Sequence, residues 1–222
     1  MTELLTDDEI ERLLNEVNAA YEDDKEESGD FNTDSRPEKF SREQMREISL
    51  IHENFARMAA KSLSTKLCRT FRIAVASTDQ LYMGEFLRTI PAPTTLGVID
   101  MNPLKGSAVL EIDPSITFAI IDKICNSSIV STKSWHELTD NEKFLMKGIY
   151  AGLLDDLRDA WYKLTDLKPR LDRIETDPRF IKLVPPSEGV VLITFEAKMD
   201  DVEGMMNFCI PYSVIERVKE EL

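Results

Sequence analysis

The side chains that most often perform catalysis or bind metals are few in this sequence, and their spacing supports neither role. His52 and His136 have no cysteine or second histidine nearby at the spacing of metal ligands. Cys68, Cys125 and Cys209 are odd in number, far apart and set among apolar residues, which indicates reduced core thiols rather than a disulfide or zinc framework. The sequence has no glycine-rich dinucleotide loop, Walker loop, nucleophile elbow or zinc-protease helix. We therefore expect no enzymatic activity, no metal and no cofactor.

Residues suited to binding a partner protein are concentrated in the first 20 positions. Thr6-x-x-Glu9 is a capping box, and the apolar residues that follow it form one stripe of a helix. A helix this short is marginal alone in water, so we predict that it orders when the stripe enters a groove of a partner. The residues expected to make this contact are Glu9, Ile10, Glu11, Leu13, Leu14, Asn15 and Val17.

Residues 21–40 are expected to be a disordered acidic linker. Eight carboxylates lie between Glu22 and Glu38 against Lys25 and Arg36, and there are too few large apolar groups to offset the entropy of ordering the chain.

The net charge of −14 argues against nucleic acid or anionic lipid as the main partner. No stretch approaches 18 consecutive apolar residues, so we expect a cytoplasmic protein without membrane insertion.

The rest of the chain, residues 41–222, is predicted to be one α/β domain built from an internal repeat, 41–138 and 139–222. Ser41-x-x-Gln44 and Thr139-x-x-Glu142 are capping boxes 98 residues apart, and each precedes a long amphipathic helix. Strands are expected at 71–76, 94–101 and 107–112, with a short helix at 82–88 and another helix from Pro114. Each half alone would bury a small core. We therefore predict a pseudo-twofold domain with two long helices packed on a central sheet.

Several segments resemble the flagellar motor switch protein FliM family. They are residues 48–57 (ISLIHENFAR), 82–86 (YMGEF), 110–115 (LEIDPS), 118–122 (FAIID) and 138–142 (LTDNE). The opening residues 5–15 (LTDDEIERLLN) are also similar to the family's N-terminal element. The resemblance covers nearly the whole chain and combines a terminal helix, an acidic tether and a duplicated domain.

The resemblance implies a set of partners. In this family the terminal helix binds phosphorylated CheY, and the middle domain has the pseudo-twofold fold of the CheC phosphatases and binds FliG. Members of the family also pack beside neighbouring FliM subunits and FliN in the cytoplasmic ring of the motor. This ring lies at the inner-membrane side of the flagellar basal body. Coupling of chemotaxis signals to the direction of rotation is the function that follows from these contacts.

The FliG contact is expected at two loops that follow strand or helix ends. The residues are Asp100, Met101, Asn102 and Pro103 in one loop, and Asn126, Ser127, Ser128, Ile129 and Val130 in the other. The family usually has Gly-Gly-x-Gly at 126–129, and the loss of these glycines changes the backbone conformations that this loop can adopt. The family also ends in a FliN-like domain that is absent here, which indicates either a truncated chain or a short paralogue.

Two other functions are compatible with the sequence. A CheC-like phosphatase acting on phosphorylated CheY would need a Glu-x-x-Asn pair on each long helix, and neither predicted helix has one facing outward. An α/β binding domain whose terminal helix docks on its own domain is the third possibility. Comparing the binding of phosphorylated and unphosphorylated CheY separates all three.

Overall fold

The computed structural model describes residues 39–125 and 135–219, and its two long helices begin at the predicted caps. Helix α2 (Arg42–Leu67) starts at Ser41, whose hydroxyl accepts a hydrogen bond from the Gln44 backbone while the Gln44 side chain accepts one from the Ser41 backbone. Helix α5 (Asp140–Trp161) starts with the same reciprocal pair at Thr139 and Glu142. The shorter helices are α3 (Met83–Thr89), α4 (Pro114–Ile124), α6 (Tyr212–Ile215), η1 (Pro178–Phe180) and η2 (Glu216–Val218).

The described strands form one antiparallel sheet with a symmetric order. They are β1 (Phe71–Tyr82), β2 (Thr95–Asp100), β3 (Ser107–Ile112), β4 (Arg170–Glu175), β5 (Gly189–Met199) and β6 (Val202–Pro211). Their order across the sheet is β1-β5-β6-β3-β2-β4. Exchanging β1 with β4, β2 with β5 and β3 with β6 returns the same order reversed, so the pseudo-twofold axis passes between β3 and β6. The predicted α/β fold with two long helices on a central sheet is confirmed.

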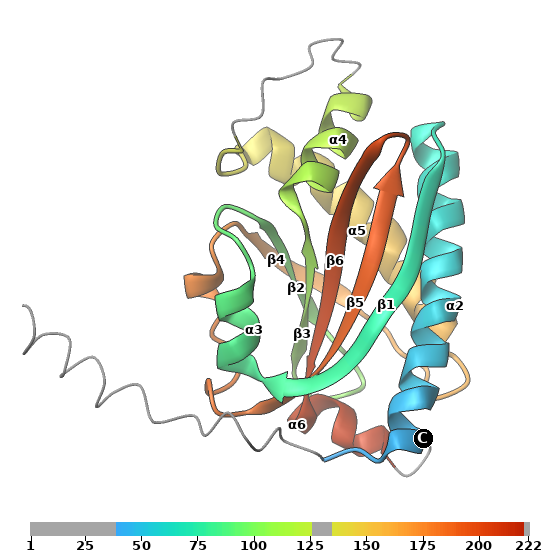
Figure 1. Ribbon diagram of the computed structural model, residues 1–222, viewed down its shortest axis with the longest axis vertical. Coiled ribbons are helices and arrows are strands. Elements are labelled where there is room, and N and C mark those ends of the chain that lie inside the picture. Colours follow the sequence, from blue (N-terminus) through green and yellow to red (C-terminus); the bar gives the residue numbers. More distant parts are fainter. Residues whose placement is uncertain (1–38, 126–134, 220–222) are drawn as a thin grey trace, which may run out of the picture. The chain divides into compact units, whose positions relative to one another are not determined.

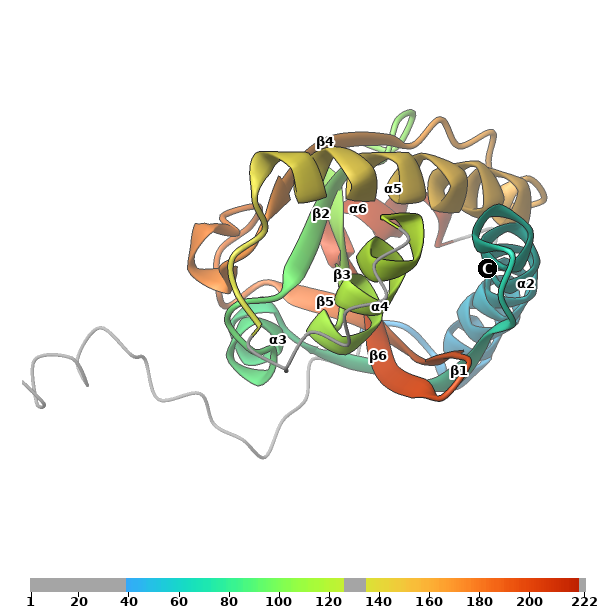
Figure 2. The same ribbon diagram turned by 90° about the horizontal axis from the view of Figure 1, so that it is seen from above.

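The two faces of the sheet are covered unequally (Figures 1 and 2). Helices α2, α4 and α5 share one large core with the sheet residues of one face. On the other face α3 covers one end through Met83 and Phe86, and no helix lies in front of the rest of β1, β5 and β6 in Figure 1. Within the described part of the chain, none of the helices has the length and apolar content needed to cross a bilayer.

The beginning of the domain differs from the prediction. Lys39 and Phe40 were expected in the disordered linker, but Phe40 is buried and packs edge-on against Tyr212 with ring centroids 5.4 Å apart. The Gln80 amide accepts hydrogen bonds from the backbones of Lys39 and Phe40 and donates one back to Phe40. The predicted linker therefore extends too far at this end, because one aromatic group and one amide suffice to fix two residues. Residues 1–38 lie outside the described residues.

Helix α5 is joined to the β2–β3 hairpin through Tyr150 and Gly97. The Tyr150 hydroxyl accepts a hydrogen bond from the Gly97 N–H (3.1 Å) and donates one to the Leu110 carbonyl (2.9 Å). A Cβ on Gly97 would lie 2.3 Å from the Tyr150 ring, so the glycine makes room for the tyrosine. At the equivalent positions of the repeat stand His52 and Phe195, whose rings are 6.4 Å apart. The two halves thus fill the same place in the core with different pairs of side chains.

Candidate protein-binding groove

Of the histidines and cysteines, His52 and Cys209 are buried in the core, whereas Cys68 and Cys125 are exposed, so the prediction of core thiols is wrong for these two. His52 is fully buried, with Nδ1 against the Ile48 carbonyl at 2.7 Å and with the rings of Trp161 and Phe208 around it. Burial lowers the pKa of His52 to about 4, so the ring is neutral near pH 7. Across residues 39–125 and 135–219, no group of histidine, cysteine and carboxylate side chains could hold a metal ion.

The long helices also lack the side chains that the phosphatase alternative requires. On α2 the residue one turn after Glu47 is Leu50, and on α5 the residue one turn after Glu142 is Leu145. Glu142 is moreover engaged in the helix cap, where it accepts hydrogen bonds from Thr139. We find no pair of Glu and Asn one turn apart on α2 or α5 that could orient a water molecule.

The structure describes one of the two loops predicted to bind FliG, residues 100–103. Asn102 and Pro103 are exposed in the β2–β3 turn, whereas Met101, also predicted as a contact residue, is 0% exposed and packs in the core. Asp100 is half-buried at the end of β2. The turn lies at one end of β3 and α4 follows the other end, a distance of roughly 20 Å at about 3.3 Å per residue. The β2–β3 turn and the start of α4 therefore lie at opposite ends of β3.

Residues 126–130, predicted to bind FliG, and residues 9–17, predicted to bind CheY, lie outside the described residues. The described residue next to the first of these segments is Cys125, the C-cap residue that follows α4.

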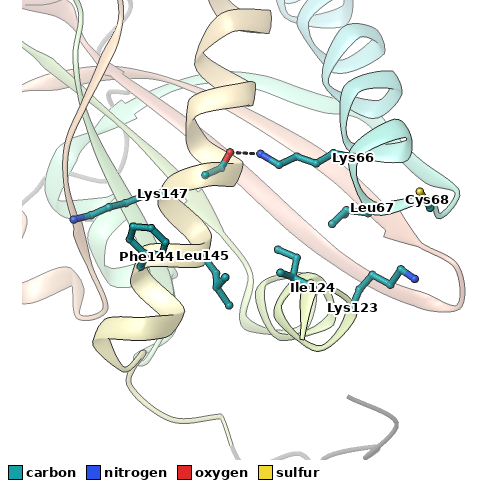
Figure 3. A pocket seen from close by; sticks show the side chains of 9 residues that line it. Lys66, Leu67, Cys68, Lys123, Ile124, Phe144, Leu145 and Lys147 are labelled. Carbon is teal, nitrogen blue, oxygen red and sulfur yellow. Dashed lines mark hydrogen bonds between the residues drawn. The ribbon is translucent and has the colours of Figure 1, made fainter. Parts of the chain in front are cut away.

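A groove opens beside this end of α4, between the C-terminal end of α2 and the first turns of α5 (Figure 3). Its volume is about 700 Å³. We call it the lysine groove, and its lining consists of Lys66, Leu67, Cys68, Lys123, Ile124, Phe144, Leu145, Lys147 and Gly148. Three chain segments that are far apart in the sequence thus meet at one surface.

The lysine groove combines exposed apolar groups with positive charge. The side chain of Phe144 is 74% exposed, and Ile124 at the end of α4 is also exposed. Lys66 reaches across from α2 and donates a hydrogen bond to the Gly148 carbonyl of α5 (Figure 3). Lys123 of α4 and Lys147 of α5 also line the groove, in a chain whose net charge is −14. This surface suits a protein segment that carries apolar side chains together with carboxylates.

Sequence reasoning missed this groove, although one signal was present. Phe144 lies two residues before Met146, which begins the buried stripe of α5, so its aromatic ring is out of phase with the core. A large aromatic residue on the polar face of a helix is a recognisable sign of a binding surface. Lys66 and Lys123 gave no such sign, because lysines near helix C-termini are common for electrostatic reasons.

Comparison with known proteins places the chain among flagellar switch proteins. The family model described as flagellar motor switch protein FliM matches residues 41–222. FliM of Treponema pallidum is 49% identical over 232 residues, which cover 100% of this chain and 67% of that protein. FliM of Borreliella burgdorferi is 46% identical over 189 residues, which cover 84% of this chain and 53% of that protein. The chain thus spans between about half and two thirds of these relatives.

Solved structures agree with this result. The crystal structure of the FliG–FliM complex from H. pylori contains a chain that is 30% identical, with a TM-score of 0.78 over 81% of this chain and 99% of that one. The FliM middle domain from H. pylori, also 30% identical, gives a TM-score of 0.76 over 82% of this chain and 99% of that one. Since the family model spans the folded part of the sequence and the relatives reach 49% identity, this chain belongs to the flagellar motor switch protein FliM family.

Proposed function

We propose that the chain is a non-enzymatic component of the flagellar motor switch that binds FliG through residues 41–222 and phosphorylated CheY through residues 1–20. In this role it couples chemotaxis signals to the direction of rotation, in the cytoplasm at the periphery of the inner membrane, beside FliN and further FliM subunits. The observation that carries the proposal is the likeness to a FliM chain in complex with FliG, together with a groove suited to a protein partner.

We place the FliG contact at the lysine groove. Lys123 and Ile124 line the groove and lie three and two positions before residue 126, the first of the residues 126–130 where the sequence predicts this contact. Phe144 and Ile124 would be buried by a partner, and each large apolar side chain that leaves water contributes about 1.5–3 kcal/mol. The three lysines would then act at the rim, where charge affects the rate and specificity of association more than its strength.

Replacing Phe144 by aspartate is expected to weaken FliG binding by about 10- to 100-fold, because a buried aromatic contact becomes a carboxylate. The helix itself should persist, since the side chain is 74% exposed. Titration of purified FliG with the full chain measures the change. Phe180→Asp, an exposed phenylalanine on η1, is the matched control. Equal affinities for the Phe144→Asp variant and the wild type would move the contact elsewhere, for example to Asn102 and Pro103.

The CheY contact is tested in the same full chain. Ile10→Ala or Leu14→Ala is expected to weaken binding of phosphorylated CheY by at least about tenfold, because each substitution shortens the apolar stripe. Arg12→Ala is the control, since Arg12 lies off the stripe. Circular dichroism melting should be the same for all variants. If deleting residues 1–20 leaves CheY binding intact, or lowers the melting temperature of residues 41–222, the segment is not a CheY-binding helix.

A further inference from the structure

A buried carboxylate lies where the two halves of the sheet meet. Glu111 of β3 is 2% exposed and stands opposite Asn207 of β6. It accepts hydrogen bonds from the Thr94 hydroxyl (2.5 Å) and from the Asn207 amide (2.9 Å). The Asn207 oxygen in turn accepts one from the Thr194 hydroxyl of β5 (3.0 Å). Every donor in this series of hydrogen bonds therefore points toward the Glu111 carboxylate.

The same chain of hydrogen bonds continues to helix α4. Besides Glu111, the Thr94 hydroxyl has a second acceptor within reach, the Ile112 carbonyl at 3.3 Å. This carbonyl also accepts from the hydroxyl of Thr117, in the first turns of α4, at 3.2 Å. The Thr117 hydroxyl lies 3.0 Å from that of Thr95 at the start of β2. Because the Thr94 hydroxyl can donate either to Glu111 or to the Ile112 carbonyl, this series of hydrogen bonds has two arrangements.

The charged and titratable groups around Glu111 do not offset its charge. Asp113, which follows β3 and caps α4, repels the Glu111 carboxylate, and the Tyr150 hydroxyl of α5 lies close enough to Glu111 for the two groups to interact. Burial raises the pKa of Glu111 to about 7, against the lowering effect of the hydrogen bonds from Thr94 and Asn207. Cys209, nearby on β6, remains a thiol because burial raises its pKa well above the usual range.

We propose that Glu111 is a proton-binding site that sets the direction of the hydrogen bonds running from the β3–β6 junction to the first turns of α4. When Glu111 takes a proton from solvent, its O–H donates to the Thr94 oxygen, and the Thr94 hydroxyl turns to the Ile112 carbonyl. That carbonyl then shares its lone pairs between Thr94 and Thr117. When the proton leaves, the Thr94 hydroxyl returns to the carboxylate and Thr117 keeps the carbonyl to itself.

Helix α4 connects this proton site to the lysine groove. The helix spans Pro114–Ile124, so Thr117 lies near its beginning while Lys123 and Ile124 at its end line the groove. If the groove binds FliG, which rests on the proposed function, that binding also becomes sensitive to pH. The proton site itself does not depend on the identity of the partner.

The test is a nuclear magnetic resonance titration of the full chain between pH 5 and pH 9. The Glu111 carboxyl carbon is expected to titrate with a midpoint near 7, and the Thr117 and Thr95 signals should follow the same midpoint. In Glu111→Gln the response of Thr117 should disappear. In Thr94→Val the Glu111 carboxyl should still titrate, at higher pH because it has lost a donor, while the response of Thr117 is lost.

The controls keep the result interpretable. Thr94→Ser retains the hydroxyl and should restore the response of Thr117, which separates hydrogen-bond transfer from a packing defect. Thr65→Val, at an exposed site on α2, should change nothing. A Glu111 carboxyl that stays ionised down to pH 5, or a Thr117 response that persists in Glu111→Gln, overturns the proposal. Unchanged FliG binding by Phe144→Asp, together with an intact Glu111 titration, would count against the proposed function and not against the proton site.

Discussion

Replacing Phe55 by alanine is expected to lower the free energy of unfolding by about 3–5 kcal/mol. Replacing Leu153 by alanine is expected to lower it by about 2–5 kcal/mol. Each side chain is 1% exposed, and each stands at the equivalent position of the repeat on its own long helix. Phe55 packs edge-on against Phe195 of β5 with ring centroids 5.6 Å apart. Because protein interiors are close-packed, truncation leaves a cavity in addition to the lost burial of apolar surface. Urea unfolding followed by fluorescence and circular dichroism measures the loss.

Both variants should still unfold in a single transition, because the sheet interleaves the two halves. Strand β1 of the first half pairs with β5 of the second, and β4 of the second half pairs with β2 of the first. Neither half can therefore complete its sheet alone. Leu50→Ala is the control on α2, where the side chain is 42% exposed and the expected loss is below about 0.5 kcal/mol. Two separate transitions within residues 41–222 would contradict the single cooperative domain.

The sequence was informative about local structure and about repetition. Capping boxes are short-range signals, so Ser41 and Thr139 located the starts of α2 and α5 correctly. The strand order was not predictable in the same way, because the β1–β5 and β2–β4 pairings join residues between about 70 and 130 positions apart and depend on the final packing. Strand β1 is also longer than expected, since its polar second half, Ser77–Gln80, gains its strand structure from pairing with β5.

The candidate site was less predictable than the fold. Met101 follows a strand and precedes a turn, which suggests that it is exposed. Its side chain is nevertheless buried in the core, whereas Asn102 and Pro103 are exposed. The lysine groove requires the ends of α2 and α4 to meet the start of α5, and no local pattern encodes that meeting. Glu111 gave no signal either, because a glutamate in a strand is normally solvent-facing and its burial depends on Thr94 and Asn207 arriving from other segments.

The raised pKa of Glu111 also affects how the stability of the protein depends on pH. Its pKa of about 7 in the folded protein exceeds the ordinary value of 4.5, so the folded state binds the proton more tightly than the unfolded state does. The stability that this proton provides is fully present below about pH 4.5 and is lost as the pH rises through 7. A difference of this size corresponds to about 3 kcal/mol, at about 1.36 kcal/mol for each pKa unit.

Glu111→Gln should remove this dependence while keeping the hydrogen bonds. The glutamine oxygen can accept from Asn207, and its amide can donate to the Thr94 oxygen, as the protonated carboxyl does. We therefore expect the free energy of unfolding of the variant, relative to wild type, to rise by about 3 kcal/mol between pH 4.5 and pH 8.5. Urea unfolding at several pH values gives this difference directly, and other ionisable groups cancel because they are common to both proteins. Glu196→Gln, an exposed glutamate on β5, should give a difference that stays flat across the same range. A flat difference for Glu111→Gln as well would mean that Glu111 is ionised in the folded protein throughout, with its two hydrogen bonds compensating fully for burial.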